Sequence, residues 1–483
     1  MLICIIPKIE PDAPTAGPAI LKSHLEAANY TCEVLDLNIK LFRALVKRDA
    51  GWWYWYENDR LFSNRTGVLS DDFNTFYGKH KDIILSWIYY IRRKNPRFVG
   101  MSLLTSYSQS VAIKLSELIK EYLPHIKIIW GGAHIDSNTR VFVESGLIDY
   151  YIYGDGEHTL IEFMRGNYEF HGINSKLPNQ LADLDSILLP NYDNIVWDEY
   201  EKRLSEPIYI TGSRGCVKRC DFCNVYEIWP DYKFRKGDKI ANEIRHVNKK
   251  YGRNTFLFTD SLINGSMKAF RELLTELTEY KIEVPGLKWQ SQWIIRSKSQ
   301  SPESDYIAMK ASGCVELDVG IESFNQDTRF NMGKKFTDED MWWCFDILQK
   351  HKIRHTLLLI NGYPGETQQH HDHTLDTIKQ LFALGYANSI DEFGNKLIYF
   401  SFNSTLILDD GLPIWKKVKD DLDYWVDPYN WSYRGVDMAE RIRRFDEITA
   451  LIKELGNQEQ GFMTKRAVED QKKVLFKEAT TWI

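Results

Sequence analysis

The sequence has no broad excess of positive charge, no membrane-length apolar run and no secretory leader, and each absence excludes a class of protein. Its 61 Lys and Arg residues are outnumbered by 67 Asp and Glu residues, for a formal net charge of −6, so a general nucleic-acid-binding surface is not expected. No apolar run reaches the roughly 18 to 20 residues that a membrane helix needs. The first residues, Met-Leu-Ile-Cys-Ile-Ile-Pro, lack a basic region and a cleavage site. We therefore expect a cytoplasmic protein that binds neither nucleic acid nor membrane.

Cysteine is scarce as well. The chain has seven cysteines in 483 residues, an odd and small number that does not suggest a secreted disulfide framework. Cys4, Cys32, Cys314 and Cys344 are scattered among apolar neighbours and are expected to be small buried side chains. The other three fall within eight residues, which indicates metal chemistry. The chain thus offers thiolate ligands for one cluster only.

What the sequence does contain is the composition of a large globular protein. Apolar residues make up 43% and charged residues 27% of the chain, which excludes a disordered protein. A length of 483 residues exceeds what one hydrophobic core normally serves, so two domains, or one domain with large extensions, are expected.

Residues 1–165 show the alternation of a parallel α/β domain. Helical patterns at 18–29 and 109–122 separate short apolar runs that predict buried strands, which lie at residues 2–6, 32–37, 98–103, 126–130 and 150–153. The block is therefore predicted to be Rossmann-like. A segment from about 40 to 95 breaks the alternation, carries the aromatic run at 52–56 and is predicted to be a helical insertion.

After a weakly periodic linker at 166–206, the alternation resumes over residues 207–402. Six strand-like runs are each separated by room for one helix, and they lie at 208–211, 255–259, 287–293, 315–321, 355–360 and 397–402. Six βα units at this spacing predict an open, partial TIM-type barrel. Residues 403–483 are aromatic, charged and then amphipathic. They predict a mainly helical extension that either packs across the barrel or covers the substrate.

The clustered cysteines lie directly after the first predicted barrel strand. The run from Gly215 to Cys223 reads Gly-Cys-Val-Lys-Arg-Cys-Asp-Phe-Cys, at the mouth where βα loops of barrels build active sites. Such spacing lets one loop hold Cys216, Cys220 and Cys223 at three corners of a [4Fe–4S] cluster while the fourth iron stays open. Arg214, Lys218 and Arg219 would favour thiolates over thiols. A zinc site would need a fourth ligand, and none lies nearby in the sequence.

At these residues the chain resembles the radical S-adenosylmethionine (SAM) superfamily, whose Cys-x3-Cys-x2-Cys motif is matched in full. The resemblance places the adenine of SAM against Phe222. It also places the ribose and amino-acid portion beside the run from Gly320 to Ser323, with Glu322 and Ser323, and beside a GxPGET-like turn containing Gly362 and Gly365. Arg296, after the third barrel strand, faces either SAM or a surface ion-pair partner.

The first block resembles the cobalamin-binding domain that precedes the barrel in one subfamily. The matching segments are Gly131-Gly132-Ala133-His134 and Gly154-Asp155-Gly156-Glu157, and the resemblance places cobalamin at Gly131, Gly132, Gly154 and Glu157. Ser102, Ser106 and Ser108 would hydrogen-bond its amide side chains or nucleotide tail. The loop after the first strand has no histidine, so no lower axial His ligand is expected. The alternative is a Rossmann-like domain that only shapes the substrate cavity.

Four histidines invite a metal assignment that the sequence does not favour. His134 is predicted to stabilise its loop rather than to bind cobalt. His370, His371 and His373 fall at the start of a predicted helix, where a solvated helix face is the simpler interpretation.

The resemblance implies an enzyme that cleaves SAM to a 5′-deoxyadenosyl radical and transfers a methyl group through cobalamin to an unactivated carbon or phosphorus centre. A small-molecule substrate and an electron donor such as flavodoxin or ferredoxin are expected partners. One alternative keeps the radical but catalyses a rearrangement, cyclisation or carbon–carbon coupling. Another, of a different class, is a non-catalytic iron–sulfur or zinc-binding module.

Overall fold

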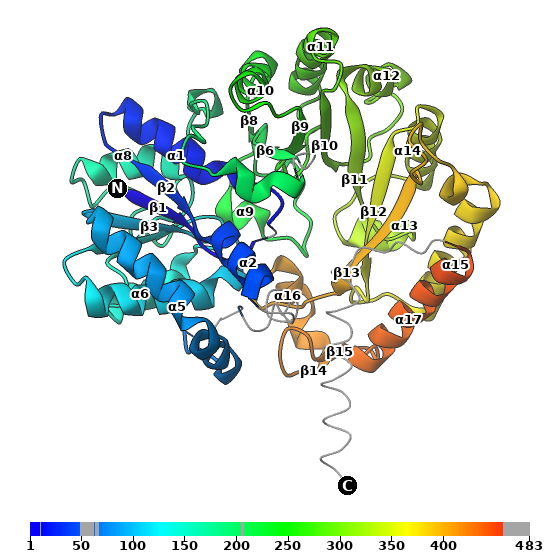
Figure 1. The fold of residues 1–483 in the computed structure, drawn as a ribbon. Coiled ribbons are helices and arrows are strands. Elements are labelled where there is room, and N and C mark those ends of the chain that lie inside the picture. The colour runs from blue at the N-terminus through cyan, green and yellow to red at the C-terminus, as the bar shows by residue number, and fades with distance from the viewer. Residues whose placement is uncertain (10, 49–61, 63–66, 204–206, 457–483) are drawn as a thin grey trace. The chain divides into compact units, whose positions relative to one another are not determined.

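The computed structural model describes residues 1–9, 11–48, 62, 67–203 and 207–456 (Figure 1). The aromatic run at 52–56, inside the predicted insertion, lies outside the described residues. No helix in the described ranges is long and apolar enough to cross a membrane. The chain divides into two compact units: the first comprises Met1–Ile210, Glu227–Arg235 and Asn242–Leu257, and the second Thr211–Tyr226, Lys236–Ala241 and Phe258–Ile483.

The first unit is built on a five-stranded sheet in the order β2-β1-β3-β4-β5, in which every neighbouring pair is parallel. Each strand predicted from the sequence is present: β1 (Leu2–Ile5), β2 (Glu33–Asp36), β3 (Phe98–Ser102), β4 (Lys127–Gly131) and β5 (Tyr150–Tyr151). Its helices include α1 (Ala16–Ala27), α2 (Leu37–Arg48), α5 (Asp71–Lys94), α6 (Gln109–Tyr122), α7 (Arg140–Glu144) and α8 (Gly156–Met164).

Helix α5 lies within the predicted insertion. It begins at Ser70, whose hydroxyl accepts a hydrogen bond from the Phe73 N–H, and ends at Asn95 in the left-handed conformation. Its buried apolar side chains recur at helical spacing and include Phe76, Ile84, Trp87 and Ile91. They belong to the same core as Leu41, Leu115 and Trp130 of the first unit. The insertion therefore extends the core of the first unit.

The strand order reverses between β1 and β3, which are hydrogen-bonded neighbours. Strand β2 follows β1 on one side, whereas β3, β4 and β5 continue on the other. In open α/β sheets, a crevice at the carboxyl ends of the strands opens at such a reversal, and ligands bind there. The fold therefore predicts the ligand site of this unit at the ends of β1 and β3.

The second sheet has six strands in the order β13-β12-β11-β10-β9-β6. The six predicted barrel strands are all found: β6 (Ile208–Ile210), β9 (Thr255–Phe258), β10 (Lys288–Trp293), β11 (Cys314–Glu322), β12 (Arg354–Asn361) and β13 (Ile398–Thr405). Strands β10 to β13 pair in parallel. The strands lie in the order of the sequence, and the sheet does not close between its end strands β6 and β13. This is the arrangement of an open, partial barrel.

Helices pack on one face of strands β10 to β13 (Figure 1). They include α11 (Met267–Glu283), α12 (Glu303–Ser312), α14 (Asp338–Lys350) and α15 (Gln368–Ala383). Ring contacts join them to the sheet, with Phe270 of α11 against Trp289, Tyr306 of α12 against Trp293, and Phe382 of α15 against Phe400. The opposite face of β11 carries the half-buried side chains of Glu316, Asp318 and Glu322. The acidic side chains of β11 therefore lie on the face of the sheet that these helices do not cover.

The C-terminal region contains helices α16 (Pro413–Val418) and α17 (Met438–Glu454), as predicted, and also an antiparallel pair, β14 (Leu422–Trp425) and β15 (Trp431–Tyr433). The hairpin was not predicted from the sequence. Two further short strands, β7 (Ser213–Arg214) and β8 (Lys233–Phe234), flank the cysteine loop in the sequence.

Candidate functional site

The cysteine loop follows β6 and β7, at the carboxyl end of the first barrel strand. Cys220 is buried, and Cys216 and Cys223 are half-buried. Burial raises the pKa of all three thiols, that of Cys220 to about 11, and the charges of Cys216 and Cys223 contribute to the rise at Cys220. The three sulfurs therefore lie within electrostatic reach of one another, as the ligands of a shared cluster must.

No three His, Cys, Asp or Glu side chains in the described part of the chain are grouped so that they could hold a single metal ion. A cubane cluster has a different requirement, because each thiolate binds its own iron. The N–H of Lys218 points at the Cys216 sulfur at 3.4 Å, a contact that stabilises a thiolate ligand. The donor set and this backbone contact fit a [4Fe–4S] cluster.

The cation that acts on all three thiols is Lys334, which sequence reasoning missed. Its positive charge opposes the burial-driven rise of each cysteine pKa and ranks ahead of Lys218 and Arg219 at Cys216. Lys334 is only 8% exposed. As predicted, the charges of Lys218 and Arg219 lower the pKa of Cys216. The charge of Lys334, in the connection between β11 and α14, lowers it more than either of them.

Lys334 is held by Glu322, at the end of β11. Its ammonium lies 2.8 Å from the Glu322 carboxylate and donates to the Gly320 carbonyl at 3.1 Å. A Cβ at Gly320 would lie 2.7 Å from that ammonium, so glycine makes the approach possible. Glu322 itself has φ +67°, a left-handed conformation that costs a non-glycine residue about 1–3 kcal/mol and is concentrated at functional sites. Ser323 is buried and accepts a hydrogen bond from the Asn325 N–H.

Two polar residues, Asp260 after β9 and Arg296 after β10, shape the neighbourhood of the loop. The buried carboxylate of Asp260 accepts hydrogen bonds from the Gly212 N–H at 2.7 Å and the Ser213 hydroxyl at 2.8 Å, so it fixes the chain just before the first cysteine. Arg296 donates to the carbonyls of Asn264 and Gly265. Burial lowers the pKa of Lys218 and the charge of Arg296 adds to that effect, so Arg296 also lies within electrostatic reach of the loop.

Phe222 is half-buried against an apolar cluster of the second unit that we call the C-terminal cluster. Its buried members are Met332, Tyr363, Leu406, Leu408, Ile414, Val418, Trp431 and Tyr433. Six of the eight lie in the predicted extension beyond residue 403, and they join Met332, just after α13 (Gln326–Asn331), and Tyr363, just after β12. The extension therefore packs behind the cysteine loop.

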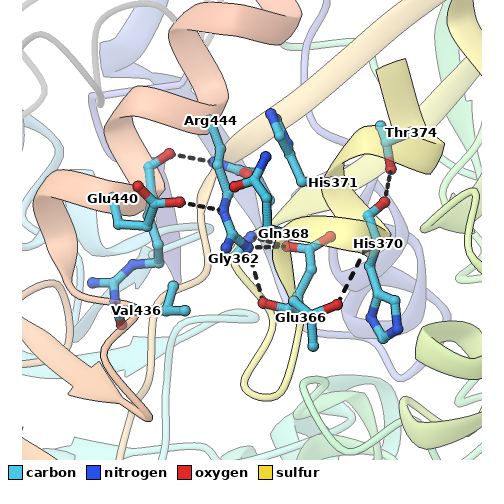
Figure 2. Close-up of polar contacts among 12 residues, drawn as sticks. Gly362, Glu366, Gln368, His370, His371, Thr374, Val436, Glu440 and Arg444 are labelled. Carbon is cyan, nitrogen blue, oxygen red and sulfur yellow. Dashed lines mark hydrogen bonds and ion pairs between the residues drawn. The ribbon is translucent and has the colours of Figure 1, made fainter. Parts of the chain in front are cut away.

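The GxPGET-like turn follows β12, as predicted, and Figure 2 shows how it meets helix α17. Gly362 has φ +79°, and its N–H donates to the Glu366 carboxylate at 2.9 Å. Arg444 of α17 donates to the Glu366 carbonyl at 2.9 Å and lies 3.9 Å from its carboxylate. A Cβ at Gly362 would meet the Arg441 side chain at 2.3 Å, whereas Gly365 has open space around it. The glycine at 362 is thus required by the packing of α17.

The prediction of a solvated face for the three helix-start histidines is wrong for His371, which is 1% exposed. Its Nε2 lies 2.8 Å from a Glu447 carboxylate oxygen on α17. His370 pairs with the Thr328 hydroxyl at 3.2 Å, and His373 is exposed. The sequence around residue 371 gives no sign that α17 packs there.

In the first unit, the reversal between β1 and β3 is lined by hydroxyl groups. Ser102 ends β3, and Ser106 begins a short 3-10 turn after it. The hydroxyls of Thr15, just before α1, and Thr105, just before that turn, are buried with no hydrogen-bond partner among the described residues. Buried hydroxyls are normally paired, so two unpaired ones at a ligand crevice fit a cofactor rich in amide groups. Ser108 is used differently, since it donates to the Ile6 carbonyl at 3.2 Å.

The glycines that carried the cobalamin resemblance lie at the ends of β4 and β5. Gly131 ends β4. Cβ atoms at Gly132 and Gly154 would meet the backbone carbonyls of Leu103 and Asn179 at 2.3 and 2.1 Å, so packing within the unit already requires glycine at both positions. Glu157 is buried in the first turn of α8. His134 pairs with the Gln109 side chain at 2.9 Å, a contact that suits the predicted loop-stabilising role.

Comparison with protein families assigns both units. Residues 81–164 match the B12 binding domain, and residues 210–378 match the Radical SAM superfamily. The protein is therefore one in which a B12 binding domain precedes a radical SAM domain. The predicted resemblance and fold class are confirmed. The cofactors that these two domains imply are cobalamin, SAM and a [4Fe–4S] cluster.

Known relatives and solved structures agree with this assignment. An uncharacterised methyltransferase, PH0819 of Pyrococcus horikoshii, is 23% identical over 60% of this chain and 66% of its own length. The fold is shared with TsrM, a radical SAM methyltransferase from Kitasatospora setae (TM-score 0.63, 18% identity, 92% of this chain and 82% of TsrM). It is also shared with the cobalamin-dependent SAM radical enzyme OxsB (TM-score 0.66, 12% identity, 94% of this chain and 66% of OxsB). The chain spans about half to two thirds of the length of the first curated relatives it matches.

Proposed function

We propose that this protein is a cobalamin-dependent radical SAM methyltransferase that methylates an unactivated carbon or phosphorus centre of a small molecule. The observation that carries the proposal is the three-thiol loop at the end of β6, with the buried Lys334–Glu322 pair beside it, in a chain that also has a B12 binding domain. The methyltransferase name of its Pyrococcus relative supports the same activity.

When bound, the cluster and SAM supply a 5′-deoxyadenosyl radical, and cobalamin supplies a methyl group. The chain's part is to hold and orient them. Cys216, Cys220 and Cys223 bind three irons, and the ammonium of Lys334 stabilises the thiolates. The buried setting of the loop limits access of water, which strengthens each electrostatic contact there.

The residues proposed to contact SAM differ in how much structural support each has. Glu322 has the best support, because its strained backbone and its pairing with Lys334 place a carboxylate near the thiols that can accept from the ammonium or hydroxyl groups of SAM. Arg296 lies within reach of the loop, and Phe222 offers a half-buried ring next to Cys223. Ser323, Gly362 and Gly365 have packing or turn roles that are compatible with binding but do not require it.

For cobalamin, we propose Ser102 and Ser106 together with Thr15 and Thr105 as hydrogen-bonding residues, because they line the reversal of the first sheet. Gly131, Gly132, Gly154 and Glu157 would border the same site at the ends of β4 and β5. A one-electron donor such as flavodoxin or ferredoxin would reduce the cluster.

The test is anaerobic reconstitution with iron, sulfide and hydroxocobalamin, followed by dithionite and SAM whose methyl group is deuterated. We expect a brown protein that retains corrin absorbance, releases 5′-deoxyadenosine and passes the labelled methyl group to the corrin. Cys216→Ala should abolish SAM cleavage. Cleavage without methyl transfer to the corrin would instead support the rearrangement or cyclisation alternative, and a colourless zinc protein would refute both.

A further inference from the structure

Asp221 lies inside the cysteine motif, directly after Cys220, and its backbone and side chain are held from three directions. Its N–H donates to the Met332 carbonyl at 3.2 Å, in the turn after β11, and its own carbonyl accepts from the Ile414 N–H at 2.9 Å, in α16. Its carboxylate accepts from the Tyr363 hydroxyl at 2.7 Å, in the turn after β12. The same oxygen, Oδ2, lies 2.6 Å from the Lys417 ammonium of α16.

The carboxylate of Asp221 is a buried negative charge next to a cluster ligand. The side chain is 5% exposed, and its second oxygen, Oδ1, is buried without a hydrogen-bond partner in the described residues. Its compensation therefore comes from Tyr363 and Lys417. The Tyr363 hydroxyl lies within electrostatic reach of Cys220 as well, since that thiol contributes to the raised pKa of Tyr363 after burial and Asp221. Charge at this point acts directly on the cluster ligands.

Helix α16 is anchored for this contact by the C-terminal cluster. Ile414 and Val418, one turn apart, are buried in that cluster together with Leu408 and Trp431, while Lys417 remains 58% exposed. The ion pair therefore reaches from the exposed side of α16 to the buried carboxylate beside Cys220, so Lys417 is placed to act on the cysteine loop.

We propose that residues 406–418 form a clamp on the cysteine loop, in which Lys417 and Tyr363 position Asp221 and neutralise its charge. The clamp slows loss of iron and raises the reduction potential of the cluster. The physical reason is that the reduced cluster carries one more negative charge, which an uncompensated carboxylate beside it disfavours. This inference rests on the proposed function only in that a cluster must occupy the three cysteines.

The decisive comparison is Lys417→Met with Lys416→Met. Both changes remove one ammonium from the exposed side of α16, but only Lys417 contacts Asp221. After anaerobic reconstitution, iron release to a strong chelator should be at least about tenfold faster in Lys417→Met than in wild type, and the midpoint potential should be more negative. Lys416→Met should match wild type in iron release and shift the potential much less. Lys417→Arg should restore both properties.

Asp221→Asn distinguishes the effect of charge on the midpoint potential from the effect of losing the ion pair on the cysteine loop. It leaves Lys417 without its carboxylate, so the midpoint potential should move in the positive direction, opposite to Lys417→Met, although both variants lose the ion pair. Tyr363→Phe should speed iron release and move the potential in the negative direction. Equal iron release and equal potentials in Lys417→Met and Lys416→Met would overturn the clamp, as would shifts of one sign in Asp221→Asn and Lys417→Met. If wild type itself binds no iron through the three cysteines, the proposed function fails instead.

Discussion

Lys334 is the buried cation whose charge lowers the pKa of all three thiols in the candidate cluster site. Its ammonium acts on three thiols and is itself balanced by Glu322 at 2.8 Å. Although burial opposes it, the charges of Glu322 and Cys220 hold the pKa of Lys334 above its usual value. The side chain therefore stays charged in the pH range where thiolates must form.

Replacing Lys334 should impair iron binding. Lys334→Met leaves the half-buried Glu322 carboxylate without its ammonium partner, which should lower the free energy of unfolding by about 3 kcal/mol and reduce iron incorporation at neutral pH. Lys335→Met, an exposed neighbour, is the matched control. The double variant Lys334→Met/Glu322→Gln should recover most of the stability but not the iron. Iron content after reconstitution and denaturant unfolding of the apoprotein measure the two effects, and full iron loading of the double variant would contradict the role given to Lys334.

Glu366 predicts a pH dependence of stability. Burial raises its pKa from the ordinary 4.5 to about 7, against the opposing effects of the Gly362 N–H and Arg444. A carboxyl whose folded pKa is raised contributes stability at low pH that is lost as the pH rises from about 4.5 to 7. Glu366→Gln removes this loss. The variant should therefore gain about 2 kcal/mol relative to wild type between about pH 5.5 and pH 8, as thermal unfolding of the apoprotein would show, and a pH-independent difference would contradict it.

At the residue scale, the sequence predicts what lies within one motif and misses what folding brings to it. Cys216, Cys220 and Cys223 are adjacent in sequence, so their shared chemistry could be inferred from spacing. Lys334 and Lys417 lie on other loops, and nothing in their local sequence marks them as neighbours of the thiols. The burial of Lys334, in the turn between α13 and α14, is visible only in the structure.

At the scale of elements, the turn between β12 and α15 is shaped by two glycines with different constraints. Both have positive φ, +79° at Gly362 and +91° at Gly365, but only Gly362 faces a neighbour that a Cβ would strike. Gly362→Ala should destabilise the second unit by about 2–4 kcal/mol, because it adds a clash with Arg441 to the backbone strain. Gly365→Ala should cost about 1 kcal/mol from strain alone. Equal unfolding midpoints for the two variants would show that Arg441 does not fix this turn.

Strands were predictable wherever an apolar run met a turn signal, which holds for every strand of both parallel sheets. The β14–β15 hairpin was not, because the exposed side chains of Tyr424, Trp425 and Tyr429 break the alternation that marks a half-buried strand. The burial of His371 was missed for a related reason. Its partner, Glu447, lies on α17, and the docking of one helix on another leaves no local trace in the sequence of either.

At the scale of the whole molecule, the two proposed cofactor sites draw on separate residues. The thiols, Lys334 and Asp221 belong to the second unit, whereas Thr15 and Thr105 belong to the first. The fold class and the order of domains could be predicted because each unit carries its own periodicity and motif. The hydroxyls at the β1–β3 reversal could not, since threonines before helices are common and their lack of partners is visible only in the structure.

Cofactor loading should therefore be separable. Thr105→Val removes a buried hydroxyl without a protein partner, so it should leave the apoprotein as stable as wild type or more so while weakening corrin retention by about fivefold or more. Iron content should be unchanged. In the reverse experiment, the variant with all three motif cysteines replaced by alanine should lose iron and keep corrin. Gel filtration followed by iron analysis and visible spectroscopy measures the iron content and the retained corrin of each variant. Loss of corrin in the variant without the three cysteines would argue against separate loading.

The division of the chain into its two compact units bears on how such a protein could be rearranged. The first unit does not end where the second begins, because Glu227–Arg235 and Asn242–Leu257 return to it after the cysteine loop. A gene fusion that joined residues 1–210 to a foreign barrel would leave those two segments behind. Recombination at a single crossover would likewise separate parts of one core. Both segments also lie within residues 210–378, which match the radical SAM superfamily, so a boundary at residue 210 would follow the family match but cut through contacts of the first unit.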